Sequence, residues 1–209
     1  MKQRVLLMMM ILAVGFFVSC KMGVKKSNAT INNLNVSIAG EIAAGVKYAA
    51  FADKAREEGL TKIAIIFDAI SKSEGVHAAN HMDVLTSLGV KMDSINPIFE
   101  VKTTKQNLEA AIEGESYESK TMYPDFIKIA TGEKIDNAVQ SFTWAMNTEK
   151  KHEVYYEMVL RELNNKTLAN LPSIYYVCPE CGNTFVTGFK DRKCPFCYTS
   201  GDQFIAVNQ

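Results

Sequence analysis

Four stretches of the sequence place carboxylates on helix faces that are otherwise apolar. Apolar residues recur at spacings of three and four between about residues 31 and 164, with only a few breaks at glycines and prolines. This pattern predicts four amphipathic helices, near residues 31–58, 60–88, 104–131 and 133–165. The longest connection, from Gly89 to Thr103, would join the second helix to the third. One long crossover at that place is typical of a ferritin-like four-helix bundle.

The inward carboxylates come with two histidines. Glu74 and His77 share the apolar stripe of the second helix, because side chains three residues apart lie on one helix face. Glu149 and His152 do the same on the fourth helix. The inward carboxylates of the first and third helices are Glu41, Glu115 and Glu118.

No lysine or arginine falls on these stripes at the same level, so the carboxylates need another cation. Carboxylate and imidazole ligands suit iron, manganese or zinc. Two Glu-x-x-His motifs, with one Glu from each of the other two helices, are the ligands of a dinuclear carboxylate site. A single Glu-x-x-His is usually a solvated helix face, so this interpretation depends on the two motifs occurring together.

Two neighbouring features have simpler interpretations. His81 lies one turn beyond His77, and we predict that it lies near the site or at the surface without binding metal. Trp144 and the methionines are predicted to pack in the core.

The C-terminal region carries four cysteines in two Cys-x-x-Cys pairs, separated by residues 182–193: Cys178 with Cys181, and Cys194 with Cys197. Two such turns can close a tetrahedral site of four thiolates, which takes zinc or iron. Two disulfides are the alternative for an exported protein. Short β-type runs at residues 173–177 and 204–207 surround the pairs. A segment this small needs the metal as its main source of stability.

The N-terminus is predicted to be a targeting signal. Lys2 and Arg4 precede an apolar run at residues 5–18, which is shorter than the roughly 20 residues of a spanning helix. The run ends in a sequence that resembles a bacterial lipobox, so we predict a signal peptide at residues 1–20, acylation of Cys20, and a tether at residues 21–30. An uncleaved membrane anchor is the alternative. Both place the N-terminus at a membrane.

Taken together, the motifs resemble those of rubrerythrin, a ferritin-like di-iron domain followed by a rubredoxin-like domain. The resemblance covers residues 34–207 and is carried by Ala39-Gly40-Glu41 with Tyr48, Glu74-Gly75-Val76-His77, Gly114-Glu115-Ser116-Tyr117-Glu118 with Met122-Tyr123-Pro124, Glu149-Lys150-Lys151-His152, and the Cys-Pro-x-Cys pairs. It implies an all-α ferritin-like four-helix bundle at residues 31–166 and a small β-rich rubredoxin-like domain at residues 172–209.

The resemblance also implies roles for single residues. The di-iron ligands would be Glu41, Glu74, His77, Glu115, Glu118, Glu149 and His152, and one rubredoxin-type iron would be bound by Cys178, Cys181, Cys194 and Cys197. Glu118 and His77 would exchange on one iron as it changes oxidation state. Tyr48 and Tyr123 would hydrogen-bond ligand carboxylates and fix their orientation. Pro124, inside the third helix, should kink it.

The implied activity is reduction of hydrogen peroxide to water in oxidative stress defence. NADH or another donor would supply electrons through the rubredoxin-type iron, and a head-to-tail homodimer would bring that iron near the partner's di-iron pair. Rubrerythrins are usually cytoplasmic, whereas the lipoprotein signal predicts a place in the cell envelope and leaves the donor open. Acidic and basic residues balance at 23 each, which gives no indication of nucleic-acid binding.

Three other functions remain open at this point. A di-iron bundle also suits a ferroxidase or iron-storage protein, or an oxygen-reducing enzyme. With zinc at the cysteines, the chain would be a zinc-stapled, membrane-attached binding protein.

Overall fold

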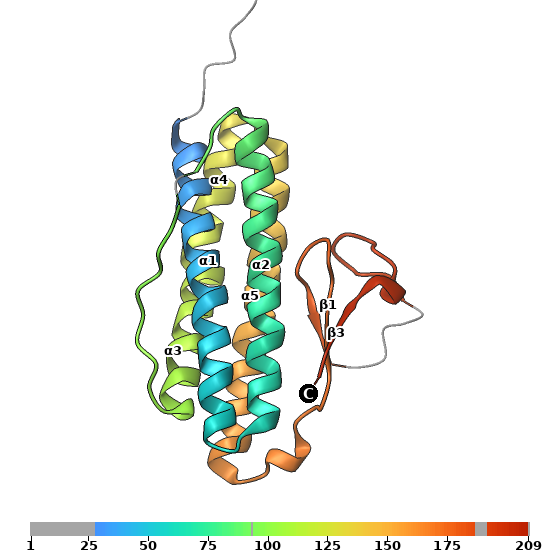
Figure 1. The fold of residues 1–209 in the computed structure, drawn as a ribbon. Coiled ribbons are helices and arrows are strands. Elements are labelled where there is room, and N and C mark those ends of the chain that lie inside the picture. Colours follow the sequence, from blue (N-terminus) through green and yellow to red (C-terminus); the bar gives the residue numbers. More distant parts are fainter. Residues whose placement is uncertain (1–27, 93, 187–191, 209) are drawn as a thin grey trace, which may run out of the picture.

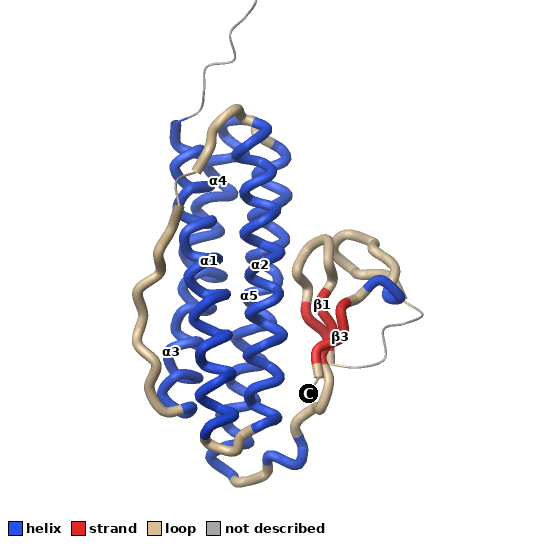
Figure 2. The backbone as a smooth tube through the Cα atoms, viewed as in Figure 1, coloured by secondary structure: helices blue, strands red, loops and turns tan. Residues whose placement is uncertain are grey.

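The computed structural model describes residues 28–92, 94–186 and 192–208, and it shows a long helical bundle beside a small sheet (Figures 1 and 2). The helices are α1 (Asn28–Glu57), α2 (Thr61–Ser87), α3 (Thr104–Tyr117), α4 (Tyr123–Glu133) and α5 (Asp136–Asn165). A π-helical turn, Glu118–Met122, joins α3 to α4, so the bundle has four helical rods. The predicted four-helix bundle with a β-rich C-terminal domain is confirmed.

The start of α1 corrects one predicted boundary. Part of the predicted tether, residues 21–30, is helical, because α1 begins at Asn28. The predicted signal peptide at residues 1–20, with Cys20, lies outside the described residues. Among the residues that are described, no helix combines the length and apolar character needed to cross a membrane.

The connection between α2 and α3 runs along the length of the bundle, so α3 starts at the same end as α2 (Figure 1). A capping box begins α3: the backbone N–H of Gln106 donates to the Thr103 hydroxyl, and the Gln106 side chain accepts from the Thr103 N–H. This long crossover is the one that the spacing of the helices predicts.

Pro124 is accommodated by the π-helical turn that precedes it. Proline has no backbone N–H, so an α-helical bond from Pro124 cannot form. The N–H of Tyr123 instead bonds to the carbonyl of Glu118, five residues back. The predicted disturbance of the third helix therefore takes the form of a π-turn, a feature often found at functional sites.

Two apolar clusters fill the bundle, and the inward carboxylates lie at the boundary between them. One cluster includes Tyr48, Phe51, Phe67 and Tyr156. The other includes Leu34, Tyr123 and Phe142. Along every rod the chain passes from one cluster to the other at the level of the glutamates. The carboxylates are thus sealed from water on both sides by packed side chains.

The C-terminal domain is an antiparallel sheet of order β2-β1-β3, formed by β1 (Tyr175–Val177), β2 (Thr184–Phe185) and β3 (Ile205–Val207). The strand β2 was not predicted. Phe185 stacks on Phe204 at 4.9 Å in a third apolar cluster that contains the cysteines. Trp144 of α5 packs against this cluster, so it lies where the domain meets the bundle and not in the bundle core.

Candidate metal centres

The structure gathers six of the seven predicted di-iron ligands into two overlapping groups. One group is Glu41, Glu74, His77 and Glu149, and the other is Glu74, Glu115, Glu149 and His152. Within each group the ligand atoms lie within 4.8 Å of one another, and every member is buried. Glu74 and Glu149 belong to both groups, so each is placed to bridge two metal ions.

The polar atoms of this cluster fit a pair of metal ions. Several buried carboxylate oxygens have no hydrogen-bond donor, including both oxygens of Glu149 and one each of Glu41, Glu74 and Glu115. Among the described residues, the ion pairs of these carboxylates are all with imidazoles: those of His77, His81 and His152. Unsatisfied buried oxygens are costly, and divalent cations would satisfy them. The oxygen and nitrogen ligands suit iron.

The pKa shifts in the cluster reflect an excess of buried carboxylates, which a cation would neutralise. Burial and repulsion by other carboxylates raise the pKa of Glu74, Glu115 and Glu149. Burial acts in the same direction on Glu41, but hydrogen bonds and attraction from His77 and His81 leave its pKa lowered. Although burial opposes it, the pKa of His77 is raised well above its usual value, chiefly by Glu149. The pKa of His152 is raised in the same way, against the effect of burial, by Glu74 and Glu149, so without metal these two imidazoles carry the balancing charge.

Tyrosines orient two of the ligands. The Tyr48 hydroxyl donates to Glu115 Oε1 at 2.7 Å, and the Tyr123 hydroxyl donates to Glu41 Oε1. Both tyrosines are buried, as the predicted hydrogen-bonding role requires.

A further hydrogen-bonded chain, which the sequence did not reveal, stands behind Tyr123. His81 Nε2 lies 3.1 Å from the Tyr123 hydroxyl, and His81 Nδ1 lies 2.7 Å from Ser141 Oγ. Because Tyr123 donates to Glu41, we infer that it accepts from Nε2–H while Ser141 donates to Nδ1. Burial lowers the pKa of His81, in keeping with a neutral ring. Of the two predicted alternatives for His81, near the site or at the surface, the structure shows the first, and His81 lies outside both ligand groups.

Glu118 is the predicted ligand that the structure leaves outside both groups. Its Oε1 lies 3.7 Å from the position that a Cβ would take at Gly40, beside the cluster. Burial, with repulsion from Glu41 and Glu115, raises the pKa of Glu118 well above its usual value. The observed arrangement therefore has His77 within the cluster and Glu118 withdrawn from it.

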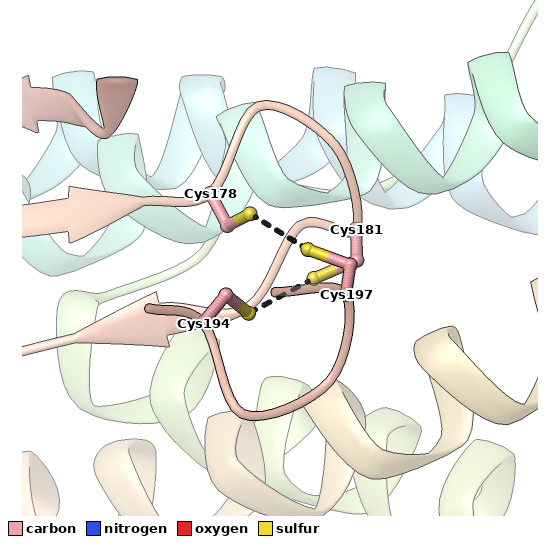
Figure 3. A group of neighbouring side chains, drawn as sticks. All are labelled: Cys178, Cys181, Cys194 and Cys197. Carbon is pink, nitrogen blue, oxygen red and sulfur yellow. Dashed lines mark hydrogen bonds between the residues drawn. The ribbon is translucent and has the colours of Figure 1, made fainter. Parts of the chain in front are cut away.

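The four predicted cysteines converge in the C-terminal domain, with their sulfur atoms facing one another (Figure 3). The sulfurs of Cys178 and Cys197 lie 3.4 Å apart, and those of Cys181 and Cys194 lie 3.5 Å apart. All four are free, so the disulfide alternative is not what the structure shows. Sulfurs bound to one tetrahedral ion at about 2.3 Å would lie about 3.8 Å apart, close to this spacing. The residues fit a single iron or zinc bound by four thiolates.

The cysteine domain docks directly on the imidazoles of the carboxylate cluster. His77 Nδ1 and His152 Nδ1 face Glu149, at 2.8 and 2.7 Å. The opposite edge of the His152 ring faces the cysteine domain, with Nε2 3.1 Å from the hydroxyl of Thr184. Gly182, next to Cys181, approaches His77 so closely that a Cβ there would lie 2.4 Å from Nε2. The two candidate metal centres are therefore joined by short paths through the histidine rings.

Hydrogen bonds hold the domain in this position. Ser73 donates to the Gly182 carbonyl at 2.7 Å, and Asn80 donates to the Glu180 carbonyl at 2.8 Å. Lys62 donates to two carbonyls of the linker before β1, those of Ala169 and Leu171. None of these contacts was predicted. The glycine after Cys181 was the one available signal, since Gly182 has a φ of +77°, a conformation that favours glycine.

Comparisons with known proteins agree with both centres. The family model described as Rubrerythrin matches residues 32–160. Nigerythrin of Nitratidesulfovibrio vulgaris is 32% identical, with 85% of this chain and 86% of that protein covered. Rubrerythrin-2 of Clostridium acetobutylicum is 29% identical over 87% of this chain and 98% of its own length. The solved structure of nigerythrin in its fully reduced, all-ferrous state is 30% identical, covers 99% of this chain and 100% of its own, and has a TM-score of 0.77. The chain therefore belongs to the rubrerythrin family, with that family's ferritin-like fold and di-iron centre, and with a cysteine site that fits one further iron.

Proposed function

We propose that the protein reduces hydrogen peroxide to water, with electrons delivered through the cysteine-bound iron. The observation that carries the proposal is the docking of the four-cysteine site on the imidazoles of the carboxylate cluster. Iron storage would not require an electron carrier at this position, whereas repeated turnover would. The family relationship supports oxidoreductase chemistry of this kind.

The reaction consumes two electrons and two protons for each peroxide, breaks the O–O bond and forms two water molecules. A pair of ferrous ions held by the two ligand groups would supply both electrons, one from each ion. The chain's own contribution is a rigid, dry ligand set: Tyr48 and Tyr123 fix the orientations of Glu115 and Glu41 by hydrogen bonding. Buried carboxylates also balance the increased metal charge after oxidation.

We propose that small oxidants approach the cluster from a groove beside Glu41. A groove of about 420 Å³ lies between α1 and α2, and Glu41 forms part of its lining. Small residues line much of the rest, including Gly45, Ala49, Gly75 and Ala78. A groove with such walls suits a molecule the size of peroxide.

Electron return follows the contact between the two centres. The carboxylate cluster and the cysteine domain docked on it belong to the same chain. Gly182 lies against His77, and Thr184 lies against His152. The proposed transfer therefore needs no second subunit. The head-to-tail dimer, the membrane location and the electron donor remain predictions from the sequence.

Glu118→Ala is expected to lower the rate of peroxide turnover by about 100-fold or more, while the iron pair and the cysteine-bound iron stay bound. The six gathered ligands still hold the pair, but the withdrawn carboxylate can no longer move in to match the higher charge of the oxidised metals. Peroxide consumption and iron content are measured together. Glu113→Ala, an exposed change on α3, is the matched control and should leave turnover unchanged. Unchanged turnover in Glu118→Ala would count against the proposal, as would a faster rate with oxygen than with peroxide in the parent protein.

Gly182→Ala is expected to slow electron transfer between the centres by more than tenfold without loss of either iron. The added methyl would meet His77 Nε2 at 2.4 Å and Ser73 Oγ at 3.0 Å, so the domain must withdraw. Rapid mixing of the reduced protein with peroxide, followed by the return of colour at the cysteine site, measures this step. Gly59→Ala is matched for backbone strain, because φ is +74° there and +77° at Gly182, yet nothing lies within 4 Å of its Cβ position. Equal rates in the two variants would exclude the direct contact as the route.

A further inference from the structure

Lys151 lies in the contact between bundle and cysteine domain, and the proposed reaction gives it no task. Its ammonium donates to the side-chain carbonyl of Asn183 and to the backbone carbonyl of Thr184. Its Nζ also lies 4.3 Å from the centre of the Phe185 ring, close enough for a cation–π interaction. A single partly buried lysine of α5 thus contacts three consecutive residues of the cysteine domain.

Asn183 connects this lysine to the cysteine site. Its side chain is completely buried, and its amide nitrogen donates to the sulfur of Cys194 at 3.7 Å. The carbonyl oxygen of the same amide accepts from Lys151. The cation therefore polarises the amide whose N–H points at a metal-binding sulfur.

This arrangement favours the reduced form of a bound iron. An iron held by four thiolates carries one more negative charge after it accepts an electron. A nearby cation and hydrogen bonds to the sulfurs stabilise the more negative form, and so raise the reduction potential. Cys194 and Asn183 are buried, so solvent screens the effect only weakly. The lysine and the sulfur are brought together only when the domain is docked.

We propose that Lys151 couples the docking of the cysteine domain to the redox state of its iron. Docking makes the iron easier to reduce, and by reciprocity the reduced domain binds the bundle more tightly than the oxidised domain, by the same factor. The domain is then held against His77 while it carries an electron, and is released more readily after the electron has left. This inference requires iron at the cysteines but holds whatever oxidant the carboxylate-bound pair uses.

The first test is the midpoint potential of the cysteine-bound iron in the full-length, iron-loaded chain, followed by its visible absorption. Lys151→Met is expected to lower the equilibrium constant for reduction about tenfold, which is about 59 mV for one electron. Lys151→Arg keeps the positive charge, so its midpoint potential should lie closer to that of the parent than to that of Lys151→Met. Lys150→Met removes a charge from the exposed neighbouring position and should change nothing. If Met prevents iron loading, Lys151→Gln takes its place. If Lys151→Met, or Lys151→Gln in its place, has the same midpoint potential as the parent, the proposal is overturned.

The second test is protease cleavage of the linker, residues 166–172, in the reduced and oxidised proteins. The parent and Lys150→Met should be cleaved more slowly when reduced. Lys151→Met should lose most of this difference. If Lys151 only held the domain in place, Lys151→Met would be cleaved faster than the parent to the same extent in both redox states, and its midpoint potential would be unchanged. That result would also overturn the proposal.

Discussion

Replacing Glu149 with Leu is expected to prevent loading of the iron pair. Glu149 belongs to both ligand groups, and its two oxygens lie 2.8 Å from His77 Nδ1 and 2.7 Å from His152 Nδ1. Its loss removes a ligand from each metal position. In the metal-free protein the same change also removes the ion pairs of Glu149 with His77 and His152, so the informative quantity is the gain in stability that iron produces in each variant.

Thermal unfolding with and without ferrous iron measures this effect. A ligand present at about 1,000 times its Kd stabilises a protein by about 4 kcal/mol, and the parent should show a gain of this order. The Glu149→Leu variant should show almost none, whereas Glu157→Leu, an exposed change two turns later on α5, should retain it. A full iron-dependent gain in Glu149→Leu would contradict the assignment of the cluster.

Cys181→Ala is expected to unfold the cysteine domain and to stop peroxide turnover, while the iron pair remains bound. The cysteines form part of the apolar cluster of the domain, and a domain this small depends on its metal. Structural metal sites of this kind contribute about 10–16 kcal/mol of binding free energy. Protease digestion should therefore remove residues 172–208 from the variant and spare the bundle.

Zinc loading of the parent cysteine site separates structure from electron transfer. Zinc suits a tetrahedral thiolate site but does not change oxidation state. The zinc-loaded protein should resist digestion like the iron form yet turn over peroxide only once per reduced iron pair. Sustained turnover with zinc at the cysteines would show that electrons reach the pair by another route.

The sequence was most informative where charged side chains occur on helix faces that are otherwise apolar. Glu74, His77, Glu149 and His152 were predictable because charged groups on an apolar helical stripe require a partner. The cysteine site was predictable because the spacing within each Cys-x-x-Cys pair is itself the structural motif. In both cases a local pattern was enough to define the side chains of the site.

Contacts between distant segments had no such local pattern. Periodicity places a side chain on a helix face but does not identify what packs there, so the predicted core packing of Trp144 did not reveal that its partner is the cysteine domain. Nothing in the sequence indicated that Lys151, between two ligands, would contact Asn183 of the cysteine domain. Glu118 begins the π-turn, and a proline six residues later indicates a break in the helix without defining the geometry of that turn.

Iron content and visible absorption of the full-length purified protein, recorded before and after peroxide is added to the reduced form, test the central claim most directly. The account predicts about three irons per chain, two in the carboxylate cluster and one at the cysteines. It also predicts a red thiolate-to-iron band that bleaches on reduction and returns with peroxide. A colourless protein with zinc at the cysteines and no response to peroxide would contradict the account, and would favour a binding or storage role.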